Sequence, residues 1–485
     1  MPGPPSSRRE DATTVTNVGP ESTAATDSAV PALVLCWSRT EPHRVGEVGF
    51  AANNGEISLF GRGTGEAGER RLLFAPLHPN APSEGLTLQG KGISRDQLRV
   101  TREGDRLRIE NVGRCAAQRN GVDFRAAHFS VGDTLHLDRQ VLLLCVSRVP
   151  VRPRPRFFPE RALGEFGRAD GVGLIGESSA VWALRDRVAF CALADEHVLV
   201  HGSSGTGKEL VAAAVHELSE RRRARLLSRN AATIPSGIAA AELFGNRKDY
   251  PNAGVPERAG LVGEADGSSL FLDELGELPR ELQSQLLRFL DSGEYTRLGE
   301  DRARRVDVRL VAATNRDPSE LKHDLFARLK LSIETPDLNQ HREDIPLLAR
   351  DLVARAAKRS PLLVQRFVRD TSRGPEFYVS PRLMERLLRH SYQLHVRELD
   401  ALLWQAMADA AGDELDLSEG VEQRLCGEGE GGAAGDVASD DIDAERLREV
   451  LSAARGNKTE AAKQLGLTSR FALYRLMKRL NVDAQ

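Results

Sequence analysis

Two short stretches hold the residues most able to do chemistry. The first, GSSGTGKE, contains the candidate phosphate-binding residues Gly202, Ser203, Ser204, Gly205, Thr206, Gly207, Lys208 and Glu209, after an apolar, strand-like run at 198–200. Glycines let the backbone bend so that N–H groups point at phosphate oxygens, and the lysine adds positive charge. Because a helix is expected to begin where this loop ends, its N-terminal dipole also favours an anion. The pattern predicts a phosphate-binding loop.

The second stretch places two carboxylates, Asp273 and Glu274, directly after the apolar run Leu270–Leu272. An aspartate at a strand end beside a phosphate loop can hold Mg²⁺, and the next carboxylate can polarise an attacking water. A solvated strand end does not explain two carboxylates directly after three residues of buried type. Together the two stretches predict a chain that binds a nucleoside triphosphate with Mg²⁺ and hydrolyses it.

Length and composition limit the class of protein. The 485 residues suggest three or four domains, and the formal net charge of −3 means that any nucleic-acid contact must come from a local basic patch. The five cysteines are scattered without a CxxC pair, which fits a reducing cytoplasm and argues against a disulfide framework or structural zinc. No apolar run approaches about 18 residues, so we expect a cytoplasmic protein with no membrane span.

The distribution of apolar, glycine and proline residues divides the chain into segments. Strand-length runs between turn residues predict an all-β sandwich or barrel, and alternating helix-like and strand-like segments predict a parallel sheet with crossover helices. Alternate prolines and a glycine-rich acidic stretch predict linkers. In chain order, the predicted segments are a disordered tail (1–29), an all-β sandwich (30–150), a Pro/Arg linker (151–171), an α/β subdomain (172–338), a subdomain that is helical throughout (339–415), a Gly/acidic linker (416–440) and C-terminal helices (441–485). Ser380 and Pro381 form a favourable helix start.

The middle of the chain carries a series of motifs. In order, they are LIGESSA (174–180), GSSGTGKEL (202–210), ELFG (242–245), LFLDELGELP (270–279), VDVRLVAATN (306–315), REDIPLLA (342–349) and VREL (396–399). Over about 240 residues this series resembles the AAA+ ATPase domain of sigma-54-dependent transcriptional activators, the bacterial enhancer-binding proteins. The resemblance implies an α/β P-loop ATPase with a helical lid, ATP and Mg²⁺ as cofactors, and a ring of identical subunits, hexameric in the family.

The resemblance also implies roles for single residues. Gly202–Gly207 and Lys208 would hold phosphates, Asp273 would coordinate Mg²⁺ and Glu274 would activate water. Asn315 and Arg397 would be the first and second sensors. Asn230 would hold the catalytic glutamate back until a partner engages, and Arg328 would reach the γ-phosphate bound to the neighbouring subunit. An arginine supplied by a neighbour makes hydrolysis depend on assembly. From composition alone, Asn315 and Arg397 would be read as a turn asparagine and a surface arginine.

Several positions depart from the family pattern. Where the family carries a projecting GAFTGA loop that contacts sigma-54, this chain has the sequence DYPNAG (Asp249–Gly254). The altered loop argues against ordinary remodelling of sigma-54 polymerase, whereas the domain architecture argues for it. Lys322 stands where the family has a first arginine before Arg328, and lysine lacks the planar fork. The tryptophan-proline-glycine-asparagine before VREL is replaced by 392–395 (YQLH). We therefore expect tight ATP binding with slow or conditional hydrolysis.

The C-terminal stretch 455–480 resembles the Fis-type helix-turn-helix of these activators. Residues 455–479 contain seven basic side chains against the single acidic Glu460, which is the local charge that attraction to DNA phosphates requires. A recognition helix places its N-terminal side chains on base edges. The candidate DNA-binding residues are Ser469, Arg470 and Tyr474 for bases, and Arg475, Lys478 and Arg479 on the same basic helix, with Lys478 and Arg479 assigned to the phosphate backbone. The alternative is a solvated basic face on a small packing helix.

The N-terminal segment resembles forkhead-associated (FHA) domains, which bind phosphothreonine peptides. The matching residues, and candidate phosphopeptide ligands, are Arg62, Ser94, Arg95 and Asn120. Arginines with a serine hydroxyl suit a phosphate, which implies a phosphoprotein or Ser/Thr kinase as partner. Gln97 stands where the family has histidine, and the asparagine expected near 114–117 is missing. The alternative is a sandwich that only packs on the ATPase or binds an unmodified partner.

Three hypotheses for the whole chain remain open. The first is an ATP-driven sigma-54 activator with an unusual contact loop. The second is a DNA-binding regulator that uses ATP only to assemble and acts without sigma-54. The third is a phosphopeptide-binding scaffold with a vestigial ATPase, which the nearly intact catalytic motifs disfavour.

Overall fold

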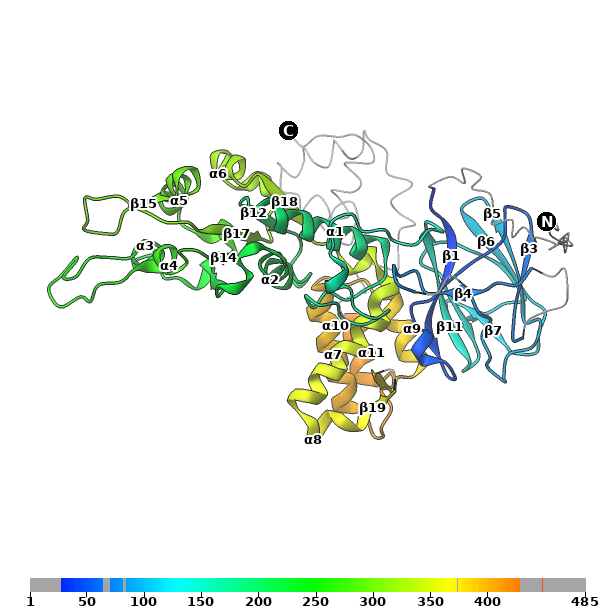
Figure 1. Cartoon of the computed structure of the whole chain (residues 1–485). Helices are drawn as coiled ribbons and strands as arrows, with labels where there is room; N and C mark the ends of the chain where they lie inside the picture. Colours follow the sequence, from blue (N-terminus) through cyan, green and yellow to red (C-terminus); the bar gives the residue numbers. More distant parts are fainter. Residues whose placement is uncertain (1–27, 64–69, 82–83, 373, 428–446, 448–485) are drawn as a thin grey trace, which may run out of the picture.

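The computed structural model describes residues 28–63, 70–81, 84–372, 374–427 and 447. The described chain is elongated: a two-sheet β domain lies at one end, an α/β subdomain extends to the other, and a helical lid lies between and below them (Figure 1). No helix among these residues is long and apolar enough to cross a bilayer. The predicted tail up to residue 27 and the C-terminal helices lie outside the described residues.

Two antiparallel sheets form the N-terminal domain. The seven-stranded sheet runs in the order β4 (Phe74–Ala75), β2 (Val48–Phe50), β1 (Val30–Ser38), β11 (Val141–Arg148), β10 (Thr134–Leu137), β7 (Ala117–Arg119) and β8 (Val122–Asp123). The four-stranded sheet runs in the order β3 (Ile57–Phe60), β5 (Leu98–Glu103), β6 (Arg106–Asn111) and β9 (Ala126–Phe129). Apolar residues of both sheets, among them Leu35, Phe60 and Val100, share one core. The predicted strand-rich segment is confirmed, and its two sheets pack on each other around this core.

The central subdomain is a three-layer α/β unit. Its parallel sheet runs in the order β13 (Leu227–Asn230), β14 (Ser269–Asp273), β17 (Arg309–Thr314), β12 (Val198–His201) and β18 (Leu331–Glu334). Its helices are α1 (Ser179–Ala194), α2 (Lys208–Leu218), α3 (Ala239–Phe244), α4 (Gly260–Glu264), α5 (Arg280–Ser292) and α6 (His323–Arg328), and a short hairpin is made by β15 (Glu294–Tyr295) and β16 (Arg304–Arg305). Strand residues alternate between two cores, since Leu199 faces one and Val198 and Val200 face the other. The predicted parallel sheet is confirmed.

The lid is mostly helical. Its elements are α7 (Ile345–Arg359), α8 (Pro361–Val364), β19 (Val368–Thr371), β20 (Gly374–Phe377), α9 (Pro381–Arg389), α10 (His395–Asp409) and α11 (Glu419–Gly427). As predicted, the Ser380 side chain caps α9 by accepting from the backbone N–H of Leu383 at 3.1 Å. The prediction of helix throughout 339–415 was wrong at 368–377, because β-branched residues and a Gly-Pro pair favour a hairpin there.

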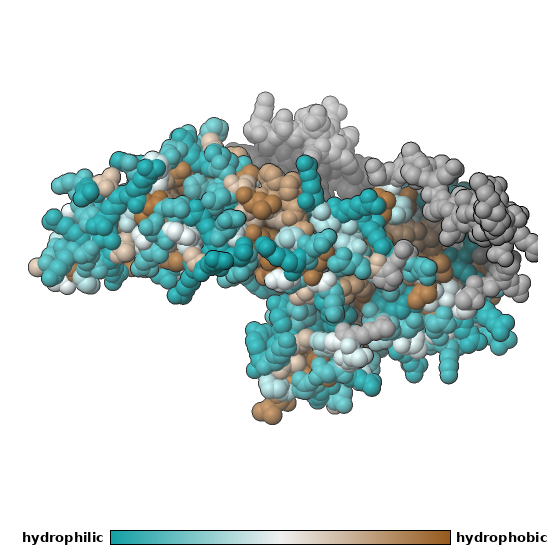
Figure 2. Space-filling model, viewed as in Figure 1, coloured by the Kyte–Doolittle hydropathy of each residue, from teal (hydrophilic) through white to brown (hydrophobic). Residues whose placement is uncertain are grey.

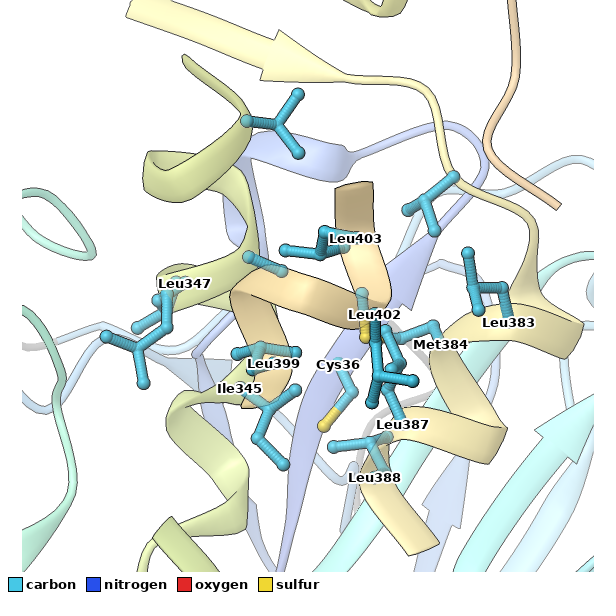
Figure 3. Packing of buried hydrophobic residues seen from close by; sticks show 14 of the residues in the cluster. Cys36, Ile345, Leu347, Leu383, Met384, Leu387, Leu388, Leu399, Leu402 and Leu403 are labelled. Carbon is cyan, nitrogen blue, oxygen red and sulfur yellow. The ribbon is translucent and has the colours of Figure 1, made fainter. Parts of the chain in front are cut away.

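The β domain and the lid share one hydrophobic core. Alternate residues of β1 (Ala32, Val34 and Cys36) point away from the sandwich core and pack with lid residues of α7, α9 and α10. Figure 3 shows Cys36 among Leu387, Leu399 and their neighbours. We call this contact region the seam. Strand β1 is therefore buried on both faces, and the lid closes the outer face of the seven-stranded sheet.

Polar contacts reinforce the seam. The Thr134 hydroxyl donates to Glu385 Oε1 at 2.7 Å, and the Trp37 indole N–H donates to the Val379 carbonyl at 2.7 Å. From the lid, Arg389 donates to the Asn120 carbonyl at 2.9 Å. The first two hydrogen bonds are buried or half-buried and satisfy polar groups that would otherwise be costly beside an apolar core, whereas the Arg389 bond is exposed.

The two predicted linkers are partly built into the fold. In the segment 151–171, Phe157 and Phe158 donate backbone N–H groups to Asp186 of α1, and the Phe157 ring packs on Phe190 at 5.1 Å between centroids. The predicted linker 416–440 was wrong at its start, where α11 buries Val421 and Leu425 one helical turn apart. Both segments contain apolar side chains that pack in the fold, which the prediction of linkers from composition did not anticipate.

Candidate functional site

The glycine-rich loop between β12 and α2 has the conformation that phosphate binding needs. Gly202, Gly205 and Gly207 all have positive φ angles, 144°, 85° and 91°. An added Cβ at Gly202 would lie 2.2 Å from the Thr335 hydroxyl, and one at Gly205 would lie 2.1 Å from the Leu394 carbonyl oxygen. Sequence reasoning did not identify Thr335, which is buried and hydrogen-bonds Thr206 at 2.7 Å. It lies under the loop and fixes its shape.

Lys208 begins α2 and folds back over the loop. Its ammonium donates to the carbonyls of Gly202 at 3.0 Å and Ser203 at 3.1 Å. Burial lowers the pKa of Lys208, while the charges of Glu274 and Asp273 act in the opposite direction. Lys208 is thus held where loop carbonyls and the strand-end carboxylates converge. Glu209, the next residue of the helix, is exposed.

The two predicted carboxylates meet this loop at the end of β14. The Asp273 carboxylate accepts the backbone N–H of Glu274 at 3.0 Å, and Glu274 itself has left-handed φ and ψ of 54° and 46°. Non-glycine residues rarely adopt that conformation, and strain of this kind gathers at functional sites. Burial and then the Asp273 charge raise the pKa of Glu274, although Lys208 and the backbone N–H of Asn315 lower it. A carboxyl with a raised pKa suits a general base.

The lid touches the loop directly. Arg397, in the first turn of α10, donates to the Ser204 hydroxyl at 3.2 Å, and the N–H of Val396 donates to the Gly205 carbonyl at 3.1 Å. The guanidinium therefore contacts the glycine-rich loop, and its charge also acts on Lys208. The structure brings together Lys208, the adjacent Asp273 and Glu274, Asn315 and Arg397, which come from four separate parts of the sequence.

Two other predicted residues have different neighbours. Asn230 ends β13 beside Asp273, and its amide donates to that carboxylate at 3.5 Å while its oxygen accepts from Ala232 at 2.9 Å. Arg328, at the end of α6, is exposed and makes an ion pair with Asp291 of α5, with Nε 2.9 Å from Oδ1. Within one protomer, Arg328 is therefore engaged by a carboxylate of its own chain.

Three of the four candidate phosphopeptide residues lie together. The N–H of Arg62 donates to the Ser94 carbonyl at 3.0 Å, and the exposed Arg95 follows directly. The Ser94 hydroxyl accepts the N–H of Arg114 at 3.1 Å. Asn120 instead binds the start of β10 with its side chain, donating to Asp133 at 2.6 Å and accepting from the Thr134 N–H at 2.9 Å.

Gln97 organises the loops around these residues. It is fully buried; its amide group donates to Asn111 Oδ1 at 2.7 Å and to the Cys115 carbonyl at 2.9 Å, and its side-chain oxygen accepts from Ser94 at 3.1 Å. Gln97 thus joins the loop before β5 to the connection between β6 and β7 at one edge of the sandwich. Nothing in a single sequence separates such a residue from an ordinary strand glutamine.

The loop 249–254 is folded onto a neighbouring loop. The N–H of Asp249 donates to the Val255 carbonyl at 2.8 Å, and the Asp249 carboxylate accepts from Gly254 at 2.8 Å. The Tyr250 ring lies against Gly299, where a Cβ would meet it at 2.5 Å. The candidate DNA-binding residues Ser469, Arg470, Tyr474, Arg475, Lys478 and Arg479 lie outside the described residues.

Comparison with known proteins places this site in a family. Residues 174–334 match the sigma-54 interaction domain, and residues 439–480 match the bacterial regulatory proteins of the Fis family. The transcriptional regulatory protein ZraR of Salmonella typhimurium is 36% identical over 314 residues, which are 63% of this chain and 68% of ZraR. The chain belongs to the family of bacterial transcriptional regulators with a sigma-54 interaction domain.

The chain is also similar in part to a second regulator and to a solved structure. The formate hydrogenlyase transcriptional activator FhlA of Escherichia coli is 35% identical over 332 residues, 66% of this chain and 45% of FhlA. The structure of NtrX from Brucella abortus in complex with ATP covers 67% of this chain and 71% of that chain, at 28% identity and a TM-score of 0.44. As a member of the family, this regulator combines an AAA+ ATPase domain with a Fis-type helix-turn-helix.

Proposed function

We propose that this regulator binds ATP with Mg²⁺, assembles into a ring through its AAA+ domain, and hydrolyses ATP to act on transcription at DNA bound by its C-terminal region. One observation carries the proposal: Lys208, Asp273, Glu274 and the lid residue Arg397 converge on one preformed glycine loop. Lys208 and the loop would hold the phosphates, and Glu274 would polarise the attacking water.

The residues of this site fit a Mg²⁺ ion that is bound together with a nucleotide. Among the described residues no cluster of three or more His, Cys, Asp or Glu side chains is arranged to hold a metal by itself. Mg²⁺ in nucleotide sites usually takes one or two carboxylates and fills its shell with phosphate oxygens and water. Asp273 would be that carboxylate, and the ion would neutralise charge on the phosphates.

The test measures the ATPase rate per protomer against protein concentration. We expect a slow rate that rises with concentration, because Arg328 would complete the site of a neighbouring subunit. Lys208→Ala should abolish binding of a fluorescent ATP analogue, whereas Glu274→Gln should keep binding and lose about 10²- to 10⁴-fold in hydrolysis. Brisk turnover by an isolated monomer would contradict the proposal.

For the β domain we propose recognition of a phosphothreonine peptide by Arg62, Ser94 and Arg95. The proposal is supported by the exposed guanidiniums of Arg62 and Arg95, which lie on loops beside the Ser94 hydroxyl. Such a cluster suits a phosphate group. Binding of matched peptides with and without phosphate tests this, with Arg62→Ala and Ser94→Ala expected to lose phosphate preference. Arg99→Ala, an exposed arginine on β5, is the matched control. Equal retention of both peptides would leave the sandwich as a packing module only.

A second candidate function is regulation without sigma-54. It is favoured by the packing of Tyr250 on Gly299, which leaves the aromatic side chain of the loop 249–254 half-buried. Replacing that loop by the family sequence GAFTGA and assaying open-complex formation by sigma-54 polymerase separates the candidates. Activation only after replacement supports sigma-54-independent action by the natural chain, and activation before it contradicts that candidate.

A further inference from the structure

Two loops at the far end of the α/β subdomain form one projecting unit, here called the double-loop tip and comprising residues 245–258 and 294–305. The N–H of Arg247 donates to the Leu298 carbonyl at 3.1 Å, and the N–H of Leu298 donates to the Gly245 carbonyl at 3.0 Å. Arg297 of the second loop pairs with Glu257 of the first at 2.5 Å. In Figure 1 both loops extend beyond β15, away from the lid and the β domain.

The double-loop tip carries an excess of basic side chains. Its basic residues are Arg247, Lys248, Arg258, Arg297, Arg302, Arg304 and Arg305, and its acidic residues are Asp249, Glu257, Glu294, Glu300 and Asp301. Three of the five acids are neutralised in ion pairs, Glu257 with Arg297, Glu300 with Arg304, and Glu294 with Arg288 of α5. That leaves two acids, of which Asp249 already accepts a backbone N–H.

Five cations of the tip have no ion pair among the described residues. They are Arg247, Lys248, Arg258, Arg302 and Arg305, and all five are exposed. Five exposed cations against two remaining acids give this end of the molecule a positive potential in a chain whose net charge is −3. A local field of this kind attracts polyanions independently of the overall charge.

The same tip lacks an apolar anchor. Among the described residues, no large hydrophobic side chain between Ile238 and Phe326 is strongly exposed, and Figure 2 shows a mainly hydrophilic surface at this end. Protein partners are usually held by buried aromatic or aliphatic anchors, whereas contacts to nucleic-acid phosphates need only Arg, Lys and backbone N–H groups. Because Tyr250 is half-buried against Gly299, the loop 249–254 offers unpaired bases little aromatic surface for stacking.

We propose that the double-loop tip binds the phosphate backbone of duplex DNA, as a second contact beside the Fis-type region. The match of residues 439–480 to the Fis family supplies the reason for choosing DNA over an acidic protein. A chain held on DNA through one element presents its other cationic surfaces to that duplex at high effective concentration. The tip would then add sequence-independent affinity and hold the ATPase domain on the duplex.

The test uses the full-length chain and a fluorescent duplex, with affinity measured between about 50 and 200 mM salt. The tip variant is Arg247→Ala with Lys248→Ala and Arg302→Ala. The matched control removes the same charge from exposed positions elsewhere, as Arg99→Ala with Arg106→Ala and Lys358→Ala. Because each phosphate contact contributes about 0.9 to the slope of log affinity against log salt, the tip variant should lower that slope by about 2 to 3.

We expect the tip variant to lose about tenfold or more in affinity at 100 mM salt, with the control within about twofold of the natural chain. Thermal melting shows whether each variant is folded. A tip variant whose DNA affinity and salt slope match those of the control overturns the proposal. A tip variant that binds DNA normally but fails to capture purified sigma-54 also overturns it, because that result would assign the tip to an acidic protein surface. The salt slope needs no ATP hydrolysis, so this proposal and the proposed ATPase cycle fail separately.

Discussion

At the scale of single residues, the observed ion pair of Arg328 and its proposed role in a neighbouring subunit exclude each other. Within one protomer its guanidinium pairs with Asp291, yet a role in hydrolysis requires it to reach a neighbour's nucleotide. The two side chains are 39% and 50% exposed, and ion pairs this accessible to solvent are weak, so assembly need not overcome a large barrier. The pair would instead keep the arginine in a defined position until a neighbour arrives.

Substitutions at this pair should separate the two roles. We expect Arg328→Ala to lower the assembled ATPase rate by about 10³-fold or more, because arginine fingers supply that order of catalysis. Asp291→Ala frees the arginine and should raise the rate at low protein concentration by about two- to fivefold. Neither change should move the melting temperature by more than about 1 °C. Loss of activity in Asp291→Ala would show that the carboxylate has a part in the reaction.

The buried carboxyl of Glu177 should make the stability of the protein depend on pH. Burial raises its pKa from 4.5 to about 7, although hydrogen bonds from Gly167 and Trp182 and the charge of Arg185 act against the shift. Because the folded chain holds this proton more tightly than the unfolded chain, the free energy of unfolding should fall as pH rises from about 4.5 to about 7. The loss is at most on the order of 3 kcal/mol.

Melting temperatures between pH 4.5 and 8 test this expectation. Glu177→Gln keeps a hydrogen-bond acceptor but cannot ionise, so its melting temperature should exceed that of the natural chain at pH 8 and match it near pH 5. The exposed Glu160→Gln serves as control and should follow the natural chain throughout. An equal pH response in Glu177→Gln would place the titrating group elsewhere.

At the scale of elements, the seam makes the β domain and the lid depend on each other. Leu387 of α9 is fully buried among residues of both. Leu387→Ala should cost about 2–5 kcal/mol through lost contacts and a cavity. We expect faster hydrogen exchange in both β11 and α10, because one core serves the two. Leu362→Ala, fully exposed on α8, should change stability by less than about 0.5 kcal/mol. Protection of β11 unchanged by Leu387→Ala would mean independent units.

The seam also marks the limit of what a single sequence reveals. The phosphate loop and the strand-end carboxylates were predictable, because glycine spacing and an apolar strand are local patterns. The runs in β1 and β11 are apolar at consecutive positions, which indicates strands covered on both faces. That signal does not say what covers them, since the lid follows about 200 residues later in the chain. The hairpin 368–377 and the contacts of Gln97 likewise depend on neighbours remote in sequence.

At the scale of the whole molecule, a continuous path of packed elements joins the two proposed ligand sites. The phosphopeptide loops belong to the β domain, whose strands β1 and β11 share a core with the lid, and the lid places Arg397 on Ser204 of the nucleotide loop. A ligand that alters the β domain's packing would therefore bias the position of the lid. Such coupling must act in both directions, because binding free energies are linked.

We expect a phosphothreonine peptide to change the affinity for a non-hydrolysable ATP analogue by about fivefold or more, and the analogue to change peptide affinity by the same factor. Titration calorimetry with each ligand, alone and with the other at saturation, measures both factors. Thr134→Val with Arg389→Ala removes two seam hydrogen bonds and should bring both factors toward one. Arg99→Ala is again the control. A factor of one in the natural chain would mean that the shared core supports the lid without coupling the two sites. A ligand that binds both arrangements of the seam equally well does not shift the equilibrium between them.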